Sequence, residues 1–185
     1  MAVAIRSISS PGCRADVAEV QAAVVRLVET AVNGPQMVPI LADQVESFAN
    51  ALRFKVHPDA AYAAVVADRS WRTDIPGIVN WARLPSMFGK LDVVHREITL
   101  DTGMIMEMLD AAKVDVGVTS EHLGALRSFM MLKGLHEIGH ALTSYCLRIL
   151  RALYGKTLSG DAGTNLEELL SGGMRFTAIM YRRDS

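Results

Sequence analysis

Several features that define other protein classes are scarce in this chain of 185 residues. It holds only two cysteines, Cys13 and Cys146, which excludes a disulfide framework and favours a reducing compartment. The 19 basic and 20 acidic side chains leave a net charge of −1, so the chain lacks the basic excess that a groove for a polyanion needs. We therefore expect no nucleic-acid partner.

Long apolar runs are also missing. Half of the residues are hydrophobic, yet no stretch reaches the roughly 18 uncharged apolar residues of a membrane-spanning helix. The first residues lack the positive-then-apolar order of a secretory signal. We expect a cytoplasmic protein with no membrane partner, folded as a single domain over residues 1–185 with one large core.

The chain is rich in helical periodicity, in which apolar residues recur at spacings of three and four. The expected helices cover 15–32, 38–54, 104–112, 121–154 and 163–171. We expect the first two to form a helical hairpin. Alternating residues predict strands over 2–8 and 91–100, and the proline- and glycine-punctuated region 55–90 predicts short strands and loops. The predicted fold class is α+β, mainly helical with a small sheet.

The longest predicted helix stands out because no proline follows Pro85. Thr119 and Ser120 are good N-cap residues, and Glu121 in the first turn complements the helix dipole. Apolar residues surround much of the helix axis over 121–154, which is typical of a helix buried on most sides. We expect this helix to lie at the centre of the fold.

Inside this helix stands the motif His136-Glu137-Ile138-Gly139-His140. Two histidines four residues apart project from one face of a helix, so both imidazoles reach one metal ion at roughly 2.0–2.1 Å. Glu137 is turned by about 100° from His136, so it is free to act as general base toward a water activated by the metal. Three polar groups side by side in an apolar helix are costly to bury without such a role. The motif predicts a zinc site.

The segment Gly134–Leu142 resembles the active-site helix of zincin metallopeptidases, specifically the gluzincin-like branch. The resemblance covers nine residues and implies a zincin-like domain with the zinc helix at its centre. It implies His136 and His140 as zinc ligands, Glu137 as general base, and a peptide or protein as substrate. The metzincin extension after His140 is absent, so a third ligand has to come from farther along the chain.

The block 160–173 offers candidates for this third ligand, namely Glu167, Glu168 and Asp161. If Leu166, Leu169 and Leu170 mark the buried face of a helix, Glu167 lies at the edge of that face. Glu168 then lies on the solvent side, and Asp161 precedes the helix. We therefore prefer Glu167 and keep Glu168 and Asp161 as alternatives.

The remaining polar and aromatic residues have simpler interpretations. His57, His95 and His122 lack partners at ligand spacing, and we expect each to be a surface histidine or one satisfied by hydrogen bonds. The two tryptophans are expected in the core, and Cys146 is expected to be a buried thiol. Oxyanion stabilisation has four candidates, for each of which ordinary packing is the favoured interpretation: Tyr145, Tyr154, Tyr181 and Arg175.

Two functions from different classes fit these residues. The first is zinc-dependent peptide hydrolysis, and the second is a zincin-like metal- or peptide-binding regulatory domain that no longer cleaves. Intact Glu137 favours the first, because a non-catalytic domain has no need for a base at that place. A helical protein without metal is the third and weakest interpretation.

Overall fold

The fold is arranged around the helix α6, which runs unbroken for 35 residues from Ser120 to Tyr154. The computed structural model describes residues 2–51, 55–114 and 119–154. The other helices are α1 (Ala15–Asn33), α2 (Met37–Ala51), α3 (Pro58–Ala67), α4 (Trp71–Asp74) and α5 (Gly103–Val114). The strands are β1 (Arg6–Ile8), β2 (Ile78–Ala82), β3 (Gly89–Asp92) and β4 (Glu97–Asp101). The expected α+β class with a small sheet is confirmed.

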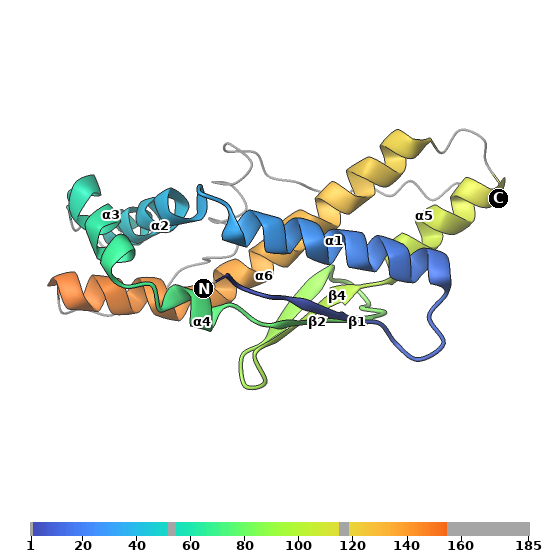
Figure 1. The fold of residues 1–185 in the computed structure, drawn as a ribbon, viewed down its shortest axis with the longest axis horizontal. Helices are drawn as coiled ribbons and strands as arrows, with labels where there is room; N and C mark the ends of the chain where they lie inside the picture. Colours follow the sequence, from blue (N-terminus) through green and yellow to red (C-terminus); the bar gives the residue numbers. More distant parts are fainter. Residues whose placement is uncertain (1, 52–54, 115–118, 155–185) are drawn as a thin grey trace.

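The four strands form one mixed sheet in the order β1-β2-β4-β3. The strands β1, β2 and β4 are parallel, whereas the edge strand β3 pairs antiparallel with β4, with Gly89 opposite Leu100. One face of the sheet is buried, and it carries the side chains of Val79, Trp81, Ile98 and Leu100. α1 contacts β1, α6 contacts β3 and β4, and both helices lie on the same side of the sheet (Figure 1).

The helix α6 is central because it packs against α1, α2, β3 and β4. Leu135, Ile138 and Leu142, which flank or lie within the histidine motif, are all buried. A close approach to α1 occurs at Gly134, where an added Cβ atom would lie 2.9 Å from Cγ2 of Val28. Glycine is therefore required for the observed packing two residues before the motif. No helix in the described part of the chain is both long and apolar enough to cross a bilayer.

Most of the predicted elements are present, but the predictions for 58–74 and 91–100 were wrong. Residues 58–74 form the helices α3 and α4 rather than strands, because His57 accepts the backbone N–H of Asp59 at 3.3 Å and Pro58 begins the helix. The predicted strand 91–100 is a hairpin instead. Asp92 accepts the N–H groups of Val94 and His95 at 3.0 Å each and so stabilises a turn between β3 and β4.

The expected hairpin of the first two helices is also not the main packing arrangement. α2 packs chiefly against α3 and makes fewer contacts with α1. Trp71 and Trp81 are buried, as predicted. The predicted helix over 163–171 lies outside the described residues.

Candidate metal centre

The two histidines of the motif meet on one face of α6. Nε2 of His136 and Nε2 of His140 are 3.1 Å apart, and the ring planes cross at 81° with centroids 4.7 Å apart. Two nitrogen ligands at 2.0–2.1 Å from a tetrahedral zinc are separated by about 3.4 Å. The imidazoles are therefore arranged nearly as a zinc ion requires, and the same distance allows a hydrogen bond between neutral rings.

Glu137, next to His136 in the motif, is only 7% exposed, and its side chain lies against the edge strand β3. A Cβ atom added at Gly89 would lie 3.1 Å from both Cγ and Oε1 of Glu137, and 3.1 Å from Cδ2 of Leu100. The carboxylate is thus held between the helix and the backbone of the edge strand β3. A carboxylate next to a histidine pair and a strand edge can exchange protons with groups that bind at that edge.

The contact between Gly89 and Glu137 gives a testable consequence. We expect Gly89→Ala to displace the Glu137 side chain by a few tenths of an ångström and to lower the rate of any reaction that uses this carboxylate by about tenfold, since a misplacement of about 1 Å can cost 10²-fold. Zinc content should stay unchanged because the histidines are not touched. Zinc analysis and turnover measured on the same preparation check this expectation.

The matched control is Gly77→Ala, because a Cβ atom at Gly77 meets only the carbonyl oxygen of Ala4 at 3.7 Å. Equal turnover of Gly89→Ala and Gly77→Ala would show that the strand does not position Glu137.

Two other residues of α6 are structural. Tyr145 is fully buried, and its hydroxyl donates to the backbone carbonyl of Asp68 at 2.8 Å. Burial raises the pKa of Tyr145, and the ring supports packing rather than an oxyanion, which confirms the favoured interpretation. Cys146 is buried as predicted, and burial raises the pKa of its thiol to about 12.

The three other histidines lie at the surface, as predicted. His57 caps α3, His122 accepts the backbone N–H of Thr119 at 3.1 Å, and His95 contacts Asp92 at 2.8 Å. The hydrogen bond with Asp92 raises the pKa of His95. These residues serve as controls for the histidines of the motif.

A third ligand is not found among the residues described by the structure, where no group of three His, Cys, Asp or Glu side chains is placed to hold a metal ion. The candidates Glu167, Glu168 and Asp161 all lie outside these residues. The oxyanion candidates Tyr181 and Arg175 do so as well.

Sequence reasoning did not include Gly89 in the site. The only signal was the glycine itself, which was interpreted as punctuation within the region 55–90.

Comparisons of the chain with family models, curated proteins and solved structures gave no match.

Proposed function

We propose that the chain is a zinc-dependent peptidase. The observation that carries this proposal is the pair of Nε2 atoms of His136 and His140, 3.1 Å apart, with the buried carboxylate of Glu137 beside them on the same helix. Imidazole nitrogens suit zinc, and a histidine pair one helical turn apart supplies two of the three protein ligands of a catalytic site.

Each residue has a separate task in this proposal. A bound zinc ion lowers the pKa of water toward about 7 and polarises a carbonyl group. His136 and His140 hold the ion as neutral imidazoles. Glu137 takes the proton of the attacking water and passes it to the leaving amine, and its buried carboxylate lies against Gly89 at the edge of the sheet.

The edge strand β3 supports a peptide as the substrate. Within the described residues β3 pairs only with β4, so its other edge carries backbone N–H and C=O groups that no described strand uses. Such an edge binds an extended peptide by backbone hydrogen bonds, independently of most of its side chains. Because Gly89 of β3 contacts Glu137, a peptide on this edge lies next to the proposed general base.

Zinc-dependent cleavage tests the function directly. We expect the full-length protein loaded with zinc to hydrolyse members of a random peptide library, and protein stripped of zinc to leave the library intact until zinc is restored. Mass spectrometry of the products is the measurement. Stoichiometric zinc without cleavage of any peptide would favour the regulatory, non-cleaving domain instead.

The third ligand is tested by three alanine substitutions in the block 160–173. We expect Glu167→Ala to weaken zinc binding by more than about 100-fold, since changes to outer-shell partners of a metal already cost 10–100-fold. Glu168→Ala and Asp161→Ala should bind zinc as the wild type does. A large loss in either of these two, with Glu167→Ala unaffected, would show that the helical-face argument has chosen the wrong residue.

A further inference from the structure

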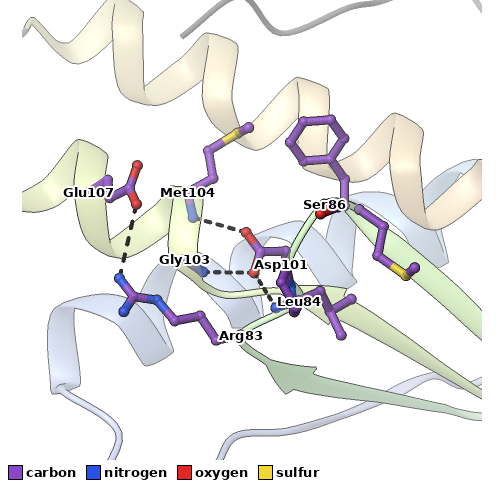
Figure 2. A pocket seen from close by; sticks show the side chains of 10 residues that line it. Arg83, Leu84, Ser86, Asp101, Gly103, Met104 and Glu107 are labelled. Atoms are coloured by element: carbon purple, nitrogen blue, oxygen red, sulfur yellow. Dashed lines mark hydrogen bonds and ion pairs between the residues drawn. The ribbon is translucent and has the colours of Figure 1, made fainter. Parts of the chain in front are cut away.

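A cavity of about 680 Å³ opens at the end of the sheet where β3 begins. It lies between the 83–88 segment that joins β2 to β3 and the first turns of α5, and Figure 2 shows its lining side chains. Its volume is typical of sites that bind small ligands or side chains. None of its lining residues belongs to α6, so it is separate from the histidine pair.

Asp101 holds the walls of this cavity in place. Its Oδ1 atom accepts the backbone N–H groups of Leu84 at 2.8 Å and Gly103 at 3.1 Å, and its Oδ2 atom accepts that of Met104 at 3.1 Å (Figure 2). The backbone N–H of Asp101 donates to the carbonyl of Phe88 at 2.9 Å. One buried residue thus joins both walls, and the cavity is preformed.

The polar groups of the cavity are largely engaged. The carboxylate of Asp101 already accepts three N–H groups, and at the rim the guanidinium of Arg83 faces the carboxylate of Glu107 at 4.0 Å (Figure 2). The rim pair balances its own charge, so the cavity favours neither an acidic nor a basic ligand. Apart from Ser86 the remaining walls are apolar, and Met87 and Met104 supply side chains that adapt to different shapes.

Phe88 lines the cavity and directly precedes β3, so the cavity lies at the beginning of the proposed peptide-binding edge. The ring of Phe88 packs edge-to-face on Phe129 of α6, with centroids 5.1 Å apart. Phe129 precedes His136 by two turns on the same face of the helix, which corresponds to about 10 Å. An extended peptide covers this distance with about three residues.

The direction of a bound peptide follows from the direction of β3. Phe88 lies by Phe129, whereas Leu91 lines a small hollow with Ala141 and Ser144 beyond the histidine pair, so β3 runs in the same direction as α6. A peptide that pairs antiparallel with β3, the more stable pairing, then runs the opposite way. Its residues after the scissile bond lie toward Phe88 and the cavity.

We propose that this cavity binds an apolar side chain, such as that of leucine, methionine or phenylalanine, from the second or third residue after the scissile bond. The proposal builds on the peptidase function, because that function defines the bond and the peptide. In this proposal the 83–88 segment and α5 select the substrate, whereas the residues of α6 carry out the hydrolysis.

The test compares two pools of fluorescein-labelled octapeptides with the same composition. In the first pool the four C-terminal residues are drawn from Leu, Met and Phe and the four N-terminal residues from Ser, Asn and Gly, and in the second pool this order is reversed. Full-length, zinc-loaded Glu137→Gln protein is used, so that anisotropy reports binding without turnover. We expect the first pool to bind about tenfold more tightly, which corresponds to about 1.4 kcal/mol.

In the same background, Met87→Glu should abolish this advantage, because it places a charge in the apolar cavity. The Met87 side chain is 47% exposed, so we expect the variant to fold. Tyr62→Glu on α3 is the matched control, since Tyr62 is 48% exposed and far from the cavity lining, and it should retain the advantage. Equal binding of the two pools, or an advantage that survives Met87→Glu, would overturn the proposed cavity.

Cleavage of the same pools by the zinc-loaded wild type separates this proposal from the peptidase function. Binding that depends on Met87 without cleavage of either pool would leave the cavity standing as a peptide subsite and overturn the peptidase. Cleavage of both pools with no preference that depends on Met87 would support the peptidase function and overturn the cavity as a peptide subsite.

Discussion

Substitution of Glu137 by glutamine is expected to lower kcat/KM for peptide hydrolysis by about 10²–10⁴-fold, the range that general acid–base catalysis contributes. The amide keeps the shape of the side chain in its narrow site against Gly89 and Leu100, but it takes up no proton. Zinc content and the thermal unfolding midpoint should match those of the wild type. The measurement is the initial rate on a cleaved peptide at matched zinc occupancy.

Glu121→Gln is the control for this variant, since Glu121 lies on the same helix and is exposed. It should retain wild-type rates. Comparable rates for Glu137→Gln and the wild type would remove Glu137 from the mechanism, even if zinc is bound.

Replacing either histidine of the motif is expected to remove zinc. In His136→Ala or His140→Ala one of the two Nε2 atoms that lie 3.1 Å apart is lost, and zinc affinity should fall by more than about 100-fold. Competition with a chromogenic chelator measures the affinity of each variant. The mutants should remain folded, because both imidazoles are half-buried at the edge of the core rather than inside it.

The matched control for the histidine variants is His122→Ala. This histidine belongs to the same helix, is exposed, and contacts only the turn at Thr119 among the described residues. It should leave zinc affinity unchanged. If His122→Ala weakened zinc binding as strongly as His136→Ala, the ion would not be held by the motif.

The features predicted correctly from sequence are those that depend on local periodicity. The helix α6 was predicted because caps, apolar spacing and the absence of proline all agree over 121–154. The approach of His136 to His140 follows from the same periodicity, since residues four apart lie one turn apart on a helix. Such features need no knowledge of the rest of the chain.

The errors occurred where hydrogen bonds of one side chain, or contacts with a distant segment, determine the backbone conformation. The helix α3 is rich in alanine and has no amphipathic pattern, so only its cap, His57 with Pro58, marked it. The turn after β3 depends on hydrogen bonds that Asp92 accepts, and these interrupt the alternating segment 91–100. The contact of Gly89 with Glu137 joins segments far apart in sequence, and no local pattern encodes it.

The cavity between the 83–88 segment and α5 likewise depends on segments that are apart in sequence. Its walls come from the 83–88 segment and from α5, and they are joined by Asp101 at the end of β4. Met104 is buried against the core and also lines the cavity, a double role that no local pattern encodes. The cytoplasmic location and the choice of Glu167 stay predictions from sequence.

Elemental analysis shows whether His136 and His140 form a zinc site in the protein. Full-length protein is purified without chelator or added metal, and its zinc content is measured per chain. About one zinc per chain is expected, retained through dialysis and lost in the two histidine variants. Protein that contains no stoichiometric metal and takes up none from micromolar zinc would contradict the assignment of the site.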